Sequence, residues 1–160
     1  MKSIFFETLN SSASSYQKIL KLVKFLDKAY IPPLSKTTDL SDYTQKIFNH
    51  ADIIIARNNK LDLGFIAIYC NDLHSKIAYI TSLGVKKDYY RLGIGQALIQ
   101  QALMLANQKN MATVRLEVTK VNKKAIRLYQ KIGFVFTDIS PKNCHNSYIM
   151  EYILPKSLCL

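Results

Sequence analysis

Residue types that mark special protein classes are scarce in this sequence. Its 160 residues include no Trp, 3 Cys, 5 Gly and 4 Pro. Cys70, Cys144 and Cys159 are odd in number and lack metal-ligand spacing, which argues against a disulfide framework and against a metal site. We therefore expect reduced thiols in a cytoplasmic protein that holds no metal.

Long apolar runs are missing as well. No stretch approaches the roughly 18 apolar residues that a membrane-spanning helix needs, so we expect no membrane association. The N-terminal segment has one Lys and a short apolar patch interrupted by Glu7, which does not predict a secretory signal. Hydrophobic residues make up 49% of the chain, and its length suits a single domain, residues 1–160, with a sizeable core.

Acidic residues are few, and the formal net charge is +11. Residues 81–160 hold 12 basic and 4 acidic residues, whereas residues 1–80 hold 10 and 7. A polyanionic ligand would account for part of this excess, although 18 Lys against 4 Arg is also typical of a solvated surface. The basic residues interleave with apolar ones and form no arm or tract, so we expect no nucleic-acid partner.

The most informative stretch runs from Tyr79 to Ala97 and has the pattern of a strand, a basic loop, two close glycines and a helix. The first N–H groups of a helix have no internal partner, and the helix dipole places about half a positive charge there. Gly93 and Gly95 leave room for an anion, and Arg91 stands beside them. The stretch predicts a phosphate-binding turn, although a plain helix start would show the same glycines.

The hydrophobic pattern predicts strands and helices along the whole chain. Strands are expected at residues 3–8, 52–57, 63–69, 77–85, 113–119, 134–139 and 146–154. Helices are expected from Tyr16 to Pro32-Pro33, from Asp39 or Ser41 to about His50, from 93 to about 108, and from Asn122 to Gly133. The last helix is expected to bury Ala125, Leu128, Tyr129 and Ile132. Alternation in strand 77–85 predicts one face with Ile77, Tyr79, Thr81 and Leu83, and another with Ala78, Ile80 and Ser82.

A second motif follows at residues 122–134, Asn-Lys-Lys-Ala-Ile-Arg-Leu-Tyr-Gln-Lys-Ile-Gly-Phe. Here the chain resembles the GCN5-related N-acetyltransferase (GNAT) superfamily, which carries Gln/Arg-x-x-Gly-x-Gly/Ala and then Asn-x-x-Ala-x-x-Leu-Tyr-x-Lys-x-Gly-Phe. The second motif matches at every defining position, and the first departs at Tyr90. The resemblance implies an α/β (α+β) fold, a mixed and mostly antiparallel sheet of about seven strands with helices on both faces and splayed central strands.

The resemblance also implies acetyl-CoA as co-substrate. It places the diphosphate on the backbone of Arg91, Leu92, Gly93, Ile94, Gly95 and Gln96. It places the pantetheine arm along Leu83, Gly84 and Val85, with Asn122, Ala125 and Tyr129 on its other side. Gly84 is compatible with a bulge that starts the splay of strand 81–85 from strand 113–119, or with a simple strand end.

Two residues are candidates for proton transfer in acetyl transfer to an amine. Tyr129 occupies the position of the family's tyrosine that protonates the coenzyme sulfur; the alternative is packing alone. Glu117 occupies the position of the base of ribosomal-protein N-terminal acetyltransferases, and burial would raise its pKa. The alternative for Glu117 is an exposed residue paired with Arg115 or a lysine. Tyr79 is a rival base or a core residue, and Tyr69 with Tyr79 is a candidate for acceptor binding.

The sequence does not define the acceptor. The scarcity of carboxylates argues against polyamines and favours a small neutral or anionic amine such as an amino sugar. The alternatives are a protein N-terminus, of the ribosomal-protein or N-terminal-methionine type, and a non-catalytic CoA-binding module. The sequence leaves a homodimer open.

Overall fold

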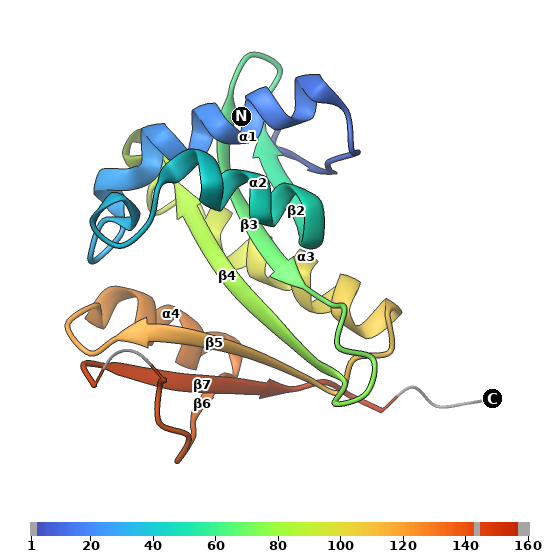
Figure 1. Ribbon diagram of the computed structural model, residues 1–160, viewed down its shortest axis with the longest axis vertical. Helices are drawn as coiled ribbons and strands as arrows, with labels where there is room; N and C mark the ends of the chain where they lie inside the picture. The colour runs from blue at the N-terminus through green and yellow to red at the C-terminus, as the bar shows by residue number, and fades with distance from the viewer. Residues whose placement is uncertain (1–2, 143–144, 157–160) are drawn as a thin grey trace.

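Seven strands in residues 3–142 and 145–156, the parts of the chain that this computed structural model describes, form one mixed sheet (Figure 1). The strands are β1 (Phe5–Thr8), β2 (Asp52–Arg57), β3 (Asp62–Tyr69), β4 (Ile77–Val85), β5 (Thr113–Thr119), β6 (Val135–Phe136) and β7 (Ser147–Ile153). The helices are α1 (Ala13–Leu26), α2 (Leu40–His50), α3 (Ile94–Gln108) and α4 (Lys123–Ile132), with 3-10 turns η1 (Asp27–Ala29), η2 (Leu34–Lys36) and η3 (Lys87–Tyr89). The sheet order is β1-β2-β3-β4-β5-β7-β6, in which β4 and β5 are parallel and the other neighbours antiparallel. The predicted fold class is confirmed.

Local capping decides where most helices begin. The Ser12 hydroxyl accepts from an N–H in the first turn of α1, and the Asp39 carboxylate accepts from two N–H groups of α2 at 2.8 and 2.9 Å. The expected end of the first helix at the prolines is wrong, because α1 ends at Leu26. There the Asp27 carboxylate accepts hydrogen bonds from the N–H and hydroxyl of Ser35 at 2.9 and 2.6 Å, which folds the chain back.

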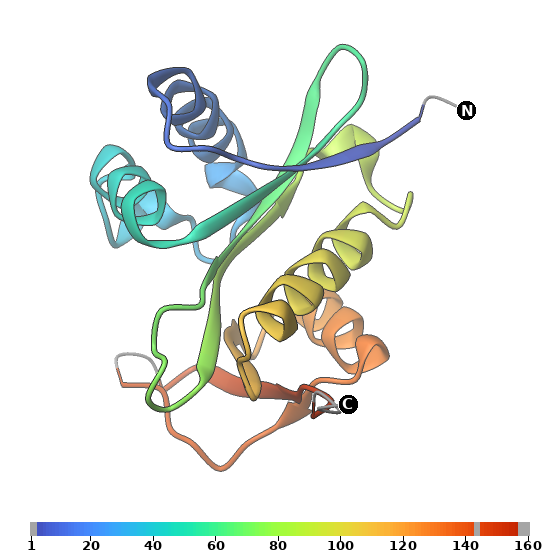
Figure 2. The same ribbon diagram turned by 90° about the vertical axis from the view of Figure 1, so that its right-hand side faces the viewer.

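Helices cover both faces of the sheet, as Figure 2 shows from the side. On one face α1 and α2 pack against alternate residues of β2 and β3, with a buried core of Ile19, Leu22, Val23, Leu26, Ile47, Ile53, Ile55, Phe65 and Ala67. On the other face α3 and α4 cover a larger core. The buried stripe of α4 includes Ile126, which the expected stripe omitted, while Ala125, Leu128 and Ile132 are only partly buried.

Strand β4 contains a bulge that shifts its alternation. Ala67 of β3 lies opposite Ser82, but the next residue of β3 lies opposite Ile80, so Thr81 is an extra residue on β4. The faces expected for β4 are therefore wrong beyond Thr81, whose hydroxyl lies near that of Tyr43 on α2. Leu83 and Val85 pack against the same core as Ile80, whereas Ser82 reaches the side of α1 and α2. The bulge lies at Thr81 and not at Gly84, which pairs regularly with β3.

The two halves of the sheet separate between β4 and β5 (Figure 1). The two strands pair only from Ile77–Thr113 to Ile80–Leu116, although β4 continues to Val85 and β5 to Thr119. Beyond that point β4 stays paired with β3, and β5 stays paired with β7. The expected splay is confirmed.

The first and last strands differ from the expected ranges. β1 begins at Phe5, and β6 covers Val135 and Phe136 only. At the end of β6 the Thr137 hydroxyl accepts from the N–H of Ile139 at 3.2 Å, which withdraws that N–H from the sheet. Cys144 and Cys159 lie outside the described residues. Across the described ranges, we find no helix whose length and hydropathy would allow it to span a membrane.

Candidate active site

The centre of the candidate site is the β4–β5 gap, the place where residues 81–85 and 117–119 do not pair with each other. The N–H of Lys86 bonds to β3 at 2.8 Å, and the N–H of Lys120 bonds to the carbonyl of Asn146, next to β7, at 2.8 Å. Because alternate residues of a strand use opposite edges, Leu83 and Val85 direct their backbone groups toward β5. An extended ligand with amide groups can therefore bind between the strands as an additional strand.

The N-terminal end of α3 is built to receive an anion. Arg91 and Gly93 both have left-handed backbone angles, with φ of 63° and 76°. Successive N–H groups in such a turn converge into an anion-binding concavity. Gly93 is the N-cap residue, and its side of the turn is open, with no atom within 4 Å of an added Cβ. No side chain of the described residues caps the helix, so its first N–H groups are available to a ligand.

Positive charge surrounds this helix end. Lys124 at the start of α4 places its Nζ 4.1 Å from the ring centroid of Tyr90, which brings α4 and the loop at 86–91 together. The loop and the first half of α4 carry Lys86, Lys87, Arg91, Lys123, Lys124 and Arg127. Asp88 is the single acidic residue of the loop. The arrangement favours a ligand with several phosphate groups.

The side chains of the predicted diphosphate-binding residues are not all exposed at the start of α3. Leu92 is exposed, but the Ile94 side chain is buried in the core, so only its backbone N–H faces a ligand. Gly95 lies between β4 and α4, where an added Cβ would be 3.6 Å from Leu128 and 4.0 Å from Val85. The helix end and the β4–β5 gap are therefore adjacent.

Tyr129 approaches the gap from the α3 and α4 side. It is almost fully buried, and its ring packs against Phe134 with centroids 5.8 Å apart. Burial raises the pKa of Tyr129 to about 12, so the hydroxyl is protonated at neutral pH. Burial is the single cause of this shift, and no hydrogen bond from a described residue contributes to it. The packing role and the proton-donor role are thus compatible in the same geometry.

Asn122 performs the capping role that its position predicts. Its Oδ1 accepts from the N–H of Ala125 at 3.2 Å, and Gly133, with φ of 123°, ends the helix. The capping bond engages the N–H of Ala125. The side-chain NH2 group of Asn122 and the half-buried side chain of Ala125 therefore remain for contact with a pantetheine arm.

Glu117 lies on β5, on the face of the sheet opposite to Tyr129. The helices α1 and α2 cover this face only in part. Its side chain is exposed, so the expected burial is wrong. The expected alternative partner is also wrong, because Arg115 forms an ion pair with Glu151 on β7. Among the described residues no ion pair engages Glu117. An exposed, unpaired carboxylate is free to accept a proton from an amine directly or through water.

Tyr69 and Tyr79 lie opposite each other on β3 and β4, and Tyr79 is close enough to Glu117 to be affected by its charge. Burial, and next the charge of Glu117, raise the pKa of Tyr79 to about 12. Phenolate is then scarce at neutral pH, which counts against Tyr79 as the base. Burial also raises the pKa of Tyr69. Both tyrosines therefore have neutral hydroxyls at neutral pH.

The sequence pattern missed Tyr30 and Ser82. Tyr30 follows η1 in the link between α1 and α2, and its hydroxyl lies 2.7 Å from the Ser82 hydroxyl on β4. Beside them the Tyr43 hydroxyl donates to the carbonyl of Thr81 at 3.4 Å. A loop residue has no periodicity that marks it, and Ser82 was assigned to the other face because the bulge has no sequence signal.

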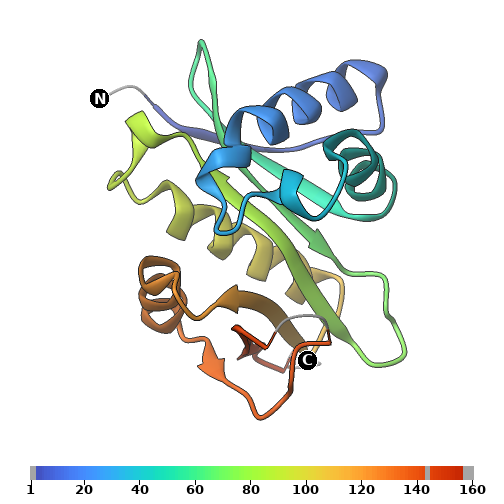
Figure 3. The same ribbon diagram turned by 60° about the vertical axis from the view of Figure 1, so that its left-hand side comes forward.

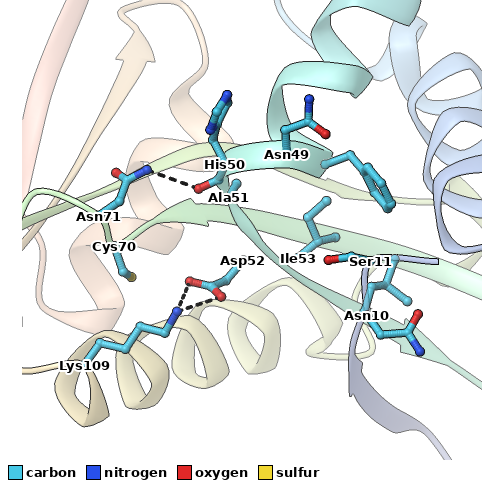
Figure 4. A pocket seen from close by; sticks show the side chains of 12 residues that line it. Asn10, Ser11, Asn49, His50, Ala51, Asp52, Ile53, Cys70, Asn71 and Lys109 are labelled. Carbon is cyan, nitrogen blue, oxygen red and sulfur yellow. Dashed lines mark hydrogen bonds and ion pairs between the residues drawn. The ribbon is translucent and has the colours of Figure 1, made fainter. Parts of the chain in front are cut away.

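A separate hollow of about 250 Å³ lies between the ends of α2 and α3 and the start of β2 (Figure 4). Lys109 donates to both carboxylate oxygens of Asp52, at 2.8 and 2.7 Å, and Asn71 donates to the His50 carbonyl at 3.3 Å. Burial, and next the charge of Asp52, raise the pKa of the Cys70 thiol to about 11, so it is unreactive at neutral pH. The hollow contains none of the residues predicted for the candidate site.

Comparison with known proteins connects this geometry to an enzyme family. Residues 20–134 match the model of the "Acetyltransferase (GNAT) family". N-alpha-acetyltransferase 30 of Homo sapiens is 30% identical over 131 residues, which cover 74% of this chain but only 36% of that protein. [Ribosomal protein bS18]-alanine N-acetyltransferase of Escherichia coli K12 is 28% identical over 107 residues, or 67% of this chain and 68% of that protein.

The solved structures agree on the fold. The PaiA N-acetyltransferase from Thermoplasma acidophilum, whose crystal structure is a complex with coenzyme A, superposes with a TM-score of 0.71. The alignment covers 94% of this chain and 99% of that one at 17% sequence identity, a level that establishes the fold alone.

Proposed function

The chain belongs to the acetyltransferase (GNAT) family, and from this premise we propose that it transfers the acetyl group of acetyl-CoA directly to an amine. The observation that carries the proposal is the β4–β5 gap, with free backbone edges on both strands and the uncapped end of α3 beside it. Acetyl-CoA has an amide-containing arm and phosphate groups, and these two features match the two parts of the site. The whole chain, residues 1–160, is proposed to act as one such domain.

The donor is held by backbone groups more than by side chains in this proposal. Leu83 and Val85 offer their free edges to the pantetheine amides, and the turn from Arg91 to Gln96 offers N–H groups to the diphosphate. Asn122 and Ala125 line the opposite side at the start of α4. This arrangement brings the thioester to the narrow end of the gap, where β4 and β5 begin to pair.

Proton transfer is assigned to residues on opposite faces of the sheet. Glu117 takes the proton of the attacking amine, directly or through water, because it is exposed beside the narrow end of the gap. Tyr129 gives its proton to the departing sulfur, because burial keeps its hydroxyl neutral and no hydrogen bond from a described residue affects its pKa. Tyr69 and Tyr79 line the approach of the acceptor.

The acceptor that we propose is the α-amine of a protein N-terminus. Support comes from the human and bacterial relatives above, whose names state N-alpha-acetylation and acetylation of a ribosomal-protein alanine. We thus propose first the acceptor that the scarcity of carboxylates made the alternative. A small-molecule amine such as an amino sugar stays a prediction, and no feature of the described site favours it.

The test is a screen of CoA release from acetyl-CoA with short peptides that begin with Ala, Ser or Met. Each peptide is matched by a copy whose N-terminal amine is blocked, and amino sugars and polyamines complete the panel. We expect release with free N-termini only and much slower release with Tyr129→Phe. Release with blocked peptides or amino sugars would contradict the N-terminal acceptor. Tight CoA binding without transfer to any amine would identify a binding module.

A further inference from the structure

The link between α1 and α2 bridges the β4–β5 gap on the side of those helices. The hydroxyls of Tyr30 and Ser82, the latter on β4, are hydrogen bonded at 2.7 Å. The Thr119 hydroxyl on β5 donates to the carbonyl of Ile31 at 3.0 Å. Two adjacent loop residues therefore contact both strands where these have separated, and Figure 3 shows this link crossing in front of β4.

The Tyr30 hydroxyl lies against the part of β4 that lines the gap. A Cβ added at Gly84 would be 3.0 Å from this oxygen and 2.8 Å from Cδ1 of Leu26. Gly84 is flanked by Leu83 and Val85, whose backbone edges face the gap. Burial, only partly offset by the Ser82 hydrogen bond, raises the pKa of Tyr30 well above its usual value. The phenol is therefore a neutral hydrogen-bond donor and not a base.

Tyr129 supplies a second neutral phenol from the opposite face of the sheet. The two tyrosines are close enough that Tyr129 is among the groups that raise the pKa of Tyr30. A thioester attacked by an amine gains negative charge at two atoms, first at the carbonyl oxygen and then at the sulfur. Two donors on opposite faces of one gap match these two atoms, and Tyr129 is already assigned to the sulfur.

We propose that Tyr30 is a further catalytic residue, which donates a hydrogen bond to the carbonyl oxygen of the acyl thioester and to the oxyanion formed there. This inference rests on the proposed function. In this proposal Ser82 is the donor of the 2.7 Å hydrogen bond between the two hydroxyls, so that the phenol proton of Tyr30 is directed into the gap. As the amine nitrogen bonds to the carbonyl carbon, the C=O electron pair moves onto oxygen. When that pair returns, the C–S bond breaks and sulfur takes the Tyr129 proton. The amine loses one proton in the same reaction, and this proton replaces the one that Tyr129 gave up. Tyr30 keeps its proton throughout.

Binding of two inert analogues tests this contact without any acceptor. One is a ketone analogue of acetyl-CoA in which CH2 replaces the sulfur, and the other is S-ethyl-CoA, which has no carbonyl. The wild type should prefer the ketone analogue to S-ethyl-CoA, and we expect this preference to be about fivefold smaller in Tyr30→Phe. A fivefold change in affinity corresponds to the loss of one hydrogen bond. The matched control Tyr43→Phe removes a neighbouring hydroxyl that donates to the Thr81 carbonyl, and should leave the ratio unchanged.

Kinetics supply a second readout once an acceptor is in hand. Tyr30→Phe should lower kcat about 100-fold while KM for acetyl-CoA changes less than threefold, as for loss of one oxyanion donor. An unchanged affinity ratio, or equal losses of affinity for both analogues, would refute the role of Tyr30 but not the proposed function. Failure of the unmodified protein to bind either analogue would refute the proposed function itself. Ser82→Ala, expected to lower the ratio in the same direction, serves if Tyr30→Phe does not fold.

Discussion

Replacing Gly93 or Gly95 with alanine makes the same chemical change two residues apart, with opposite expected results. Gly93 has a φ of 76°, where an alanine costs about 1–2 kcal/mol, although open space leaves its methyl group without a clash. Gly95 lies within α3, and its added methyl would make ordinary contacts at 3.6 Å to Leu128 and 4.0 Å to Val85. Alanine there gains up to about 1 kcal/mol from helix propensity and reduced freedom of the unfolded chain.

These free energies convert into measurable shifts. For a domain of this size 1 kcal/mol moves the melting temperature by roughly 2–4 °C. Gly93→Ala should therefore lower the melting temperature by roughly 2–8 °C, and Gly95→Ala should raise it by up to about 4 °C. The methyl group at Gly93 also occupies the open side of the anion-binding turn. Loss of one charge-assisted hydrogen bond to the diphosphate would weaken CoA binding by about 10-fold or more.

Thermal unfolding and calorimetric titration with CoA measure both effects on the same samples. We expect Gly95→Ala to keep CoA affinity within about threefold, since its methyl group points at Leu128 and Val85 rather than at the open turn. Wild-type CoA affinity in Gly93→Ala would refute the placement of the diphosphate on this helix end. A loss of stability in Gly95→Ala equal to that in Gly93→Ala would refute the packing argument.

Three further substitutions or conditions test the remaining assignments. Tyr129→Phe should keep CoA affinity and lower turnover by about 100-fold or more, measured by single-turnover kinetics; unchanged turnover would remove Tyr129 from the acid role. Glu117→Gln should lower the rate mainly at low pH, where less of the amine is neutral, and a pH–rate profile identical to the wild type would argue against a base role. Because the pKa of Tyr129 rises from about 10 in the unfolded chain to about 12, its stabilising contribution is complete below pH 10 and disappears as the pH approaches 12. The unfolding free energy of the wild type should thus fall by about 2 kcal/mol more than that of Tyr129→Phe between pH 10 and pH 12, and parallel curves in urea titrations would contradict this.

Features governed by local chemistry could be predicted from the sequence. The strands Asp52–Arg57, Ile77–Val85 and Thr113–Thr119 have the expected bounds, because β-branched runs between turn residues carry their own signal. The caps at Asp39 and Asn122 were predictable for the same reason, since each side chain bonds to an N–H only two or three residues away.

Features that depend on a distant partner could not be predicted in this way. The first helix ends at Leu26 because Asp27 bonds to Ser35, a contact across a loop that has no periodic pattern. The exposure of Glu117 depends on where α1 and α2 lie over the sheet, and its alternation along β5 is equally consistent with a buried face. The position of Tyr30 could not be predicted, because it is defined by a hydrogen bond to Ser82, 52 residues away.

The bulge at Thr81 keeps a polar side chain of β4 out of the apolar core, which regular alternation along the strand would not do. Without the extra residue, the Ser82 hydroxyl would face the apolar core of α3 and α4, where an unsatisfied hydroxyl costs about 1–3 kcal/mol. Leu83 would then face the polar hydroxyl groups on the other side. With the bulge, Ser82 meets Tyr30 and Leu83 packs beside the core. One inserted residue therefore keeps the core apolar and also places two hydroxyl groups beside the gap, on the face from which Glu117 is accessible.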